Sequence, residues 1–121
     1  MRILVVDDDL FILEMIRLML QDRFEILTAS DGQRGLEIAR TDKIDLVILD
    51  WMMPGTDGLS VLVTMKSDES TRDIPVVFLT GKTGQSDINR AYAHGAAGYI
   101  VKPFKKSDLL EKINAILGTE N

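Results

Sequence analysis

Short apolar segments alternate along this chain with longer stretches in which apolar residues return every three or four positions. The short segments, at 3–6, 24–29, 44–49, 76–79 and 98–101, are rich in β-branched residues and predict five strands. The part at 46–49 is apolar throughout, which is typical of a strand covered on both faces. The longer stretches predict five helices, at about 10–21, from 30–32 onward, and at 58–66, 85–94 and 107–117.

Each predicted helix should turn one apolar face toward the strands, although the face of the 85–94 helix is thin. We expect inward positions at Leu10, Leu13, Ile16 and Leu20 in the first helix, Leu36 and Ala39 in the second, Leu59, Leu62 and Val63 in the third, and Leu109, Leu110, Ile113, Ile116 and Leu117 in the last. Asp9 and Asp57 are suited to cap the first and third helices, Ser107 or Asp108 the last, and Gly118 to end it.

Strands that alternate with helices pair in parallel through right-handed crossovers. The sequence therefore predicts an α/β fold, a doubly wound parallel sheet of five strands in the order 2-1-3-4-5. A length of 121 residues fits a single domain over 1–121.

Composition narrows the functional classes. The net charge of −5 argues against direct nucleic acid binding by this domain. The chain has no cysteine, which excludes disulfides and thiolate metal sites. It also has neither a signal-peptide pattern nor an apolar stretch near the ~20 residues of a membrane span, so we expect a cytoplasmic location without membrane contact.

Polar side chains stand at the ends of four predicted strands. Asp7 and Asp8 follow the first strand, Asp50 the third, Thr80 the fourth and Lys102 the fifth. In an open parallel sheet, functional groups gather beyond the carboxyl ends of the strands, where the strand order reverses. The first and third strands would be neighbours ~4.8 Å apart, close enough for their three carboxylates to share one cation. Lys102, two strands further, would have to lean across.

The composition of this group favours phosphoryl chemistry. Oxygen ligands without His or Cys suit a hard cation, and Mg²⁺ tolerates few protein ligands. An ionised aspartate can act as a nucleophile toward phosphorus. Since phosphoryl transfer needs mainly positioning and charge neutralisation, Mg²⁺, a lysine and a hydroxyl are sufficient to form and hydrolyse an aspartyl phosphate.

The chain resembles the receiver (phosphoacceptor) domain of two-component response regulators over essentially its full length. The matching pieces are Ile3-Leu4-Val5-Val6-Asp7-Asp8, Asp50 with Met53-Pro54 and Asp57-Gly58, Phe78-Leu79-Thr80, and Gly98-Tyr99-Ile100-Val101-Lys102-Pro103-Phe104. The resemblance implies a flavodoxin-like fold and a signalling switch. It also implies that Asp50 accepts a phosphoryl group from a histidine kinase or phosphotransfer protein, and that the only catalysis is its own phosphorylation and dephosphorylation.

The resemblance also assigns the remaining site residues. It implies that Asp7, Asp8, Asp50 and the backbone carbonyl of Met52 organise Mg²⁺. Lys102 would contact the phosphoryl oxygens, Thr80 would move toward them, and Tyr99 would change rotamer in concert. That change would alter the surface of the fourth helix, fifth strand and fifth helix for a downstream effector or a C-terminal output domain. The Lys102–Pro103 bond is expected to be cis.

Four residues near the site have further expected roles. Asp9 is a helix cap rather than a third metal ligand, and the Trp51 ring should lie beside the site. Met52 and Lys82, each two residues beyond a site residue, are positioned to tune the access of hydrolytic water.

One enzyme class also fits the first strand. A haloacid-dehalogenase-type phosphatase begins with an apolar strand and Asp-x-Asp, which would make Asp7 the nucleophile and Asp9 the general acid. That family needs a further acidic pair after its lysine, which this chain lacks, and Asp50 would have no role. A domain of the same fold with a vestigial site is a further alternative.

Overall fold

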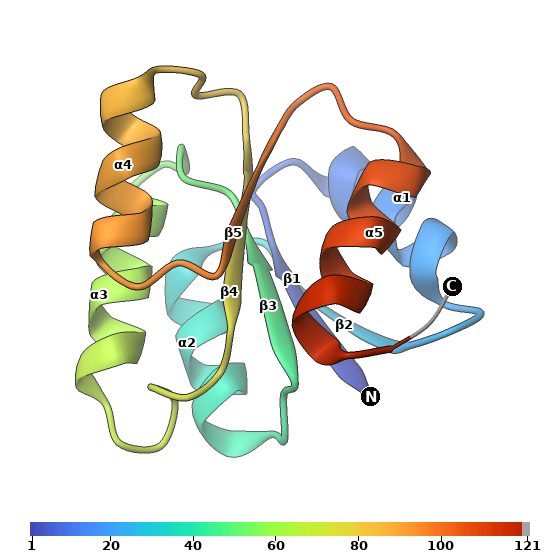
Figure 1. Cartoon of the computed structure of the whole chain (residues 1–121). Coiled ribbons are helices and arrows are strands. Elements are labelled where there is room, and N and C mark those ends of the chain that lie inside the picture. The colour runs from blue at the N-terminus through green and yellow to red at the C-terminus, as the bar shows by residue number, and fades with distance from the viewer. Residues whose placement is uncertain (120–121) are drawn as a thin grey trace.

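The computed structural model describes residues 1–119, which form five strands and five helices in strict alternation (Figure 1). The strands are β1 (Arg2–Val6), β2 (Glu25–Ala29), β3 (Leu46–Leu49), β4 (Val76–Thr80) and β5 (Gly98–Val101). The helices are α1 (Leu10–Leu20), α2 (Gly32–Thr41), α3 (Gly58–Ser67), α4 (Gln85–Ala93) and α5 (Lys106–Leu117).

The strands form one parallel sheet in the order β2-β1-β3-β4-β5, which confirms the predicted topology. Val6 pairs with Leu49 in the register of β1 and β3, so both strands end at the same level of the sheet. The residues that follow them, Asp7 and Asp50, therefore emerge side by side. At the end of β4, Thr80 pairs with Val101, the residue before Lys102.

Helices cover both faces of the sheet, with α1 and α5 on one side and α2, α3 and α4 on the other (Figure 1). Because side chains alternate along a strand, each central strand contributes to two cores. Val47, Leu49 and Phe78 face the three-helix side, whereas Ile48 and Val77 face α1 and α5. No helix within residues 1–119 is long and apolar enough to cross a membrane.

Aspartates cap the first three helices. The carboxylates of Asp9, Asp31 and Asp57 accept hydrogen bonds from backbone N–H groups of the first turns of α1, α2 and α3. Such a bond satisfies a helix N–H that has no partner within the helix. The predicted caps of α1 and α3 are thus confirmed, and each brings a helix N-terminus next to a strand end.

The predicted start of the last helix is wrong by two or three residues. The N-cap is Lys105, and Asp108 lies within the first turn, where its carboxylate accepts from the backbone N–H of Lys105 at 3.1 Å. The lysine side chain has no acceptor atom, so only this half of a capping box exists. Gly118 ends the helix with φ 72°, a left-handed conformation that glycine adopts without strain.

Two predicted inward positions are also wrong. Leu10 in α1 is 70% exposed and Val63 in α3 is 41% exposed. The inner face of α3 is instead formed by Val61, Leu62 and Met65. The strands at 24–29 and 44–49 begin one and two residues later than expected, at Glu25 and Leu46.

Candidate functional site

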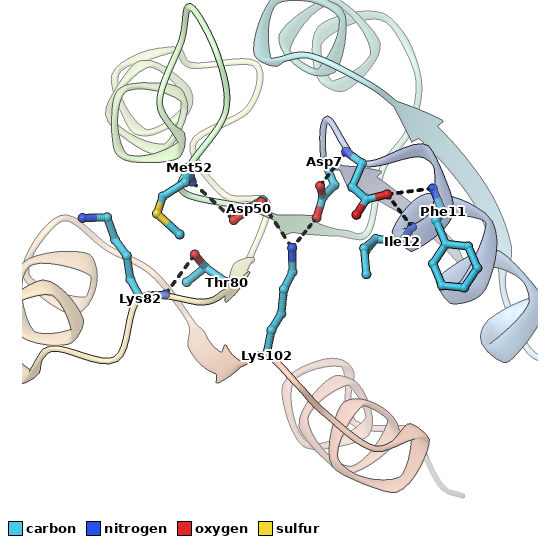
Figure 2. Close-up of polar contacts among 9 residues, drawn as sticks. Asp7, Phe11, Ile12, Asp50, Met52, Thr80, Lys82 and Lys102 are labelled. Carbon is cyan, nitrogen blue, oxygen red and sulfur yellow. Dashed lines mark hydrogen bonds and ion pairs between the residues drawn. The ribbon is translucent and has the colours of Figure 1, made fainter.

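The polar residues at the strand ends meet at one edge of the sheet (Figure 2). Asp7 and Asp50 are 2% and 6% exposed, and Thr80 at the end of β4 is fully buried. The Lys102–Pro103 bond is cis, as expected. The sequence prediction that these strand ends come together is confirmed, and Lys102 does lean across from β5.

Lys102 joins the two buried carboxylates. Its Nζ donates to Asp7 Oδ2 at 2.8 Å and lies 3.3 Å from Asp50 Oδ2 (Figure 2). The second oxygen of each acid also accepts a hydrogen bond, from Asp9 N at 2.9 Å for Asp7 and from Met52 N at 3.3 Å for Asp50. Each carboxylate is thus held in one orientation before any ligand arrives.

Burial perturbs the protonation of this pair. Desolvation raises the pKa of Asp7, and the hydrogen bonds from Lys102 and from the backbone of Asp9 offset only part of that effect. Desolvation acts to lower the pKa of Lys102, but the hydrogen bond to Asp7 and the charges of Asp50 and Asp7 outweigh it, so this pKa is raised. Lys102 therefore stays a cation, while ionised Asp7 is held at an energetic cost.

Three carboxylates meet closely enough to hold a metal ion. Asp7, Asp8 and Asp50 each bring one oxygen within 4.8 Å of the others, and within residues 1–119 no other group of three His or acidic side chains does so. Asp8 is exposed and also lines an open cleft of about 570 Å³ together with Met52 and Lys82. All the donors are oxygens, and the three carboxylates carry more negative charge than the single Lys102 can neutralise. Such a site suits a hard divalent cation, so these residues fit Mg²⁺.

Asp9 takes no part in this cluster. Its Oδ1 accepts from Phe11 N at 2.9 Å and from Ile12 N at 3.4 Å, two backbone groups in the first turn of α1. This geometry agrees with the predicted helix cap.

The N-terminus of α3 presses against the backbone that carries Asp50. Gly58 N donates to Trp51 O at 2.6 Å, and a Cβ added at Gly58 would lie 2.2 Å from Asp50 O and 2.7 Å from Trp51 Cα. Only a glycine permits this approach. The sequence shows the pair Asp57-Gly58 but not why a glycine is needed there, because the close contact exists only in the folded structure.

Trp51 lies in the core and beside the cleft. Its ring is 4% exposed and stacks on Phe78, with centroids 5.2 Å apart. Lys82 Nζ and Arg90 Cζ lie 5.1 Å and 5.7 Å from the indole centroid. Asp87, in the first turn of α4, approaches Lys82 Nζ at 3.8 Å and Arg90 at 3.7 Å. This charged group was not foreseen from the sequence.

Thr80 and Tyr99 are linked through the backbone of Lys82. Thr80 Oγ1 accepts from Lys82 N at 3.4 Å, and the hydroxyl of half-buried Tyr99 donates to Lys82 O at 2.9 Å. The Tyr99 ring also lies 5.9 Å from that of Phe78. Desolvation, with the charges of Asp87 and Asp50, raises the pKa of Tyr99 and keeps its phenol a donor.

Comparison with known proteins agrees with this geometry. The family profile described as the response regulator receiver domain matches residues 3–114. The phosphate regulon transcriptional regulatory protein PhoB of Pseudomonas aeruginosa is 39% identical over 116 residues, which are 95% of this chain and 51% of PhoB. The DNA-binding response regulator MtrA of Mycolicibacterium paratuberculosis is 38% identical over 117 residues, 96% of this chain and 51% of MtrA. The chain thus spans about half the length of these curated relatives.

Solved structures show the same fold. The chemotaxis protein CheY4 of Vibrio cholerae superposes with a TM-score of 0.91 and 32% identity, over 96% of this chain and 98% of CheY4. A CheY-like receiver domain protein from Methanospirillum hungatei gives 0.90 and 29% identity, over 97% of this chain and 93% of that protein.

The phosphatase alternative finds no support. It required Asp9 as a general acid, but this carboxylate caps α1, and the matched profile is that of a signalling domain. The strand order, the position of the site and the profile match lead to one assignment. The chain belongs to the response regulator receiver domain family, whose members act as phosphorylation switches in signal transduction.

Proposed function

We propose that this domain accepts a phosphoryl group on Asp50 from a histidine kinase or a phosphotransfer protein. The observation that carries the proposal is the position of the Lys102 ammonium, 3.3 Å from Asp50 and 2.8 Å from Asp7. A cation held there lies where negative charge collects when a phosphoryl group arrives.

Each residue of the site has a separate role in phosphoryl transfer. One oxygen of Asp50 forms the bond to phosphorus while the bond between phosphorus and the donor imidazole breaks, and the imidazole keeps that electron pair. Lys102 then turns from the carboxylates to the new phosphoryl oxygens. Asp7, Asp8, Asp50 and the carbonyl of Met52 would hold Mg²⁺, which when bound neutralises charge on the transferring group.

The switch would run through Thr80 and Tyr99. The Thr80 hydroxyl, now bonded to Lys82 N, can pair with a phosphoryl oxygen in only one of two states. The Tyr99 hydroxyl is bonded to the carbonyl of the same Lys82. A shift of the loop that carries Lys82 would therefore change the rotamer of Tyr99 and the surface of α4, β5 and α5. A cleft on that surface is lined by Tyr99, Asp108, Glu111 and Lys112.

The downstream partner is proposed to be a separate effector or a C-terminal output domain. The names of PhoB and MtrA describe transcriptional regulation and DNA binding, and each protein is about twice as long as the matched region. The net charge of −5 on this chain disfavours direct contact with nucleic acid. Catalysis by this domain would be confined to its own aspartyl phosphate.

Site mapping of the phosphorylated residue tests the proposal. After treatment with acetyl phosphate and Mg²⁺, mass spectrometry of the peptides should place one phosphoryl group on Asp50. Asp50→Asn should take up none, and EDTA should suppress the reaction in the wild type. Label on Asp7, or labelling of Asp50→Asn at the wild-type rate, would contradict the assignment.

A second experiment separates phosphorylation from switching. Thr80→Ala should be phosphorylated to nearly the wild-type extent, because the nucleophile and Lys102 are untouched. Its response to phosphorylation at the α4-β5-α5 surface should be lost, as measured by amide chemical shifts of α4 and β5. Shifts equal to those of the phosphorylated wild type would show that Thr80 does not carry the signal.

A further inference from the structure

Lys82 contacts four parts of the site at once. Its backbone N–H bonds Thr80, its backbone carbonyl bonds Tyr99, and its ammonium lies over the Trp51 ring and near Asp87. Among the described residues, Lys82 therefore joins the loop after Asp50, both proposed switch residues and the first turn of α4. A displacement of its side chain would act directly on Trp51 and Asp87, whereas Thr80 and Tyr99 contact its backbone.

The ammonium of Lys82 is held away from Asp50 in this state. Figure 2 shows its side chain turned from Asp50 and extending beside Met52. Yet Lys82 lines the same open cleft as Asp8, which brings a carboxylate oxygen within 4.8 Å of one of Asp50, so Lys82 borders the mouth of the site. The lysine stem is flexible enough to redirect its charge without moving the backbone.

The present partner of Lys82 is a weak one. The distance to Asp87 is 3.8 Å, near the limit for an ion pair, and Asp87 also approaches Arg90. The two side chains are 31% and 24% exposed, so solvent screens part of their attraction. A phosphoryl group on Asp50 would carry about −1.5 to −2 charges and strong acceptor oxygens, which compete well against one shared carboxylate.

We propose that Lys82 exchanges its Asp87 partner for a phosphoryl oxygen on Asp50, and so loosens the first turn of α4. The inference rests on the proposed phosphorylation of Asp50. Of the nine residues of α4, only Ala91 is buried, and the first turn contains no buried residue, so the ion pair of Asp87 is one of the few contacts that hold this turn. Loss of the ion pair between Lys82 and Asp87 should therefore raise the mobility of the first turn of α4.

A double-mutant cycle tests the exchange. Beryllofluoride, a stable mimic of a phosphoryl group, is titrated with Mg²⁺ present, and formation of the adduct is followed by the fluorescence of Trp51. Asp87→Asn should tighten apparent binding about two- to fivefold, because Lys82 loses its competing partner. Lys82→Met should weaken it by a similar factor, and Lys82→Arg should restore it.

The decisive variant is the double mutant. Asp87→Asn should have no effect in the Lys82→Met background, because Asp87 acts only through Lys82. Asp73→Asn, an exposed aspartate with the same charge change before β4, is the matched control and should leave the affinity unchanged. An equal effect of Asp87→Asn in both backgrounds, or an Asp73→Asn effect as large, would overturn the proposal.

Hydrogen exchange supplies a readout that affinity alone does not. In the wild type, the adduct should speed the exchange of amides in 85–93, and in Lys82→Met this response should be absent. An α4 response in Lys82→Met equal to that of the wild type would overturn the exchange. If the wild type itself forms no adduct, or Asp50→Asn titrates like the wild type, the proposed function fails instead, so the two failures are distinguishable.

Discussion

Gly58→Ala probes how tightly α3 is fitted against the backbone of the site. The new Cβ would lie 2.2 Å from Asp50 O and 2.7 Å from Trp51 Cα, and these backbone atoms cannot rotate aside. Overpacking of this kind costs about 1–3 kcal/mol, while alanine regains about 0.5–1 kcal/mol over glycine within a helix. Because the closest contact, at 2.2 Å, is with backbone, the upper end of this cost applies, and we expect a net loss of about 2 kcal/mol in the free energy of unfolding.

Urea unfolding followed by circular dichroism measures this loss. With a slope of about 2 kcal/mol per molar urea, the midpoint should fall by about 1 M. Mg²⁺ affinity should fall as well, because the displaced backbone carries Asp50. Gly81→Ala is the matched control: its added Cβ meets only Met52 Cε at 3.7 Å, an ordinary contact, so the midpoint should stay close to the wild type.

The reasoning is refuted if Gly58→Ala unfolds at the wild-type urea concentration. It is equally refuted if Gly81→Ala falls by the same amount, since the loss would then come from removing a glycine rather than from the close approach of α3.

Three further predictions concern the acids and the single tryptophan. Burial raises the pKa of Asp7 in the folded chain above its ordinary value of 3.8. Folding therefore favours protonated Asp7. The stability that this contributes is fully present below pH 3.8 and is lost as the pH rises through the raised pKa. Without Mg²⁺, Asp7→Asn should therefore gain in urea midpoint over the wild type as pH goes from 4 to 7; a constant difference would contradict the cause given. Asp9→Ser should keep the α1 cap to within about 0.5 kcal/mol and leave Mg²⁺ affinity unchanged, and a large loss of affinity by calorimetry would make Asp9 a ligand. Saturating Mg²⁺ should change Trp51 emission; an unaltered spectrum would contradict its place beside the cation site.

The parallel sheet could be predicted because strands and helices alternate along the chain. The meeting of the polar strand ends could be predicted because the carboxyl ends of parallel strands lie at one edge of the sheet. Once Asp7, Asp50, Thr80 and Lys102 are assigned to ends of parallel strands, the sheet brings them to one edge. The chemistry of the group could then be argued from residue types alone.

The faces of the helices were harder to predict. In α1, nine of eleven positions are apolar, so periodicity does not single out one face. Leu10 directly follows the cap and projects into solvent, while Leu13 and Ile16 are buried. The start of α5 was missed for a different reason: its N-cap is a lysine, whose side chain carries no acceptor, and Asp108 acts from inside the helix.

Contacts between distant segments gave no local signal. The approach of Gly58 to Asp50, and the group of Lys82, Asp87 and Arg90 around Trp51, depend on how α3 and α4 lie on the sheet. Each of these residues is an ordinary loop or helix residue in the sequence. Their roles emerge only from tertiary packing.

The small buried face of α4 affects how the sequences of such domains can diverge. Ala91 is the only buried residue of this helix, and Asp87 and Ile88 are half-buried, so the six exposed positions can be substituted without creating a cavity or a clash below. The chemistry around Asp50 and the hydrophobic layers can thus remain constant while the outer side chains of α4 change, which allows one scaffold to acquire new recognition partners by mutation on its surface alone.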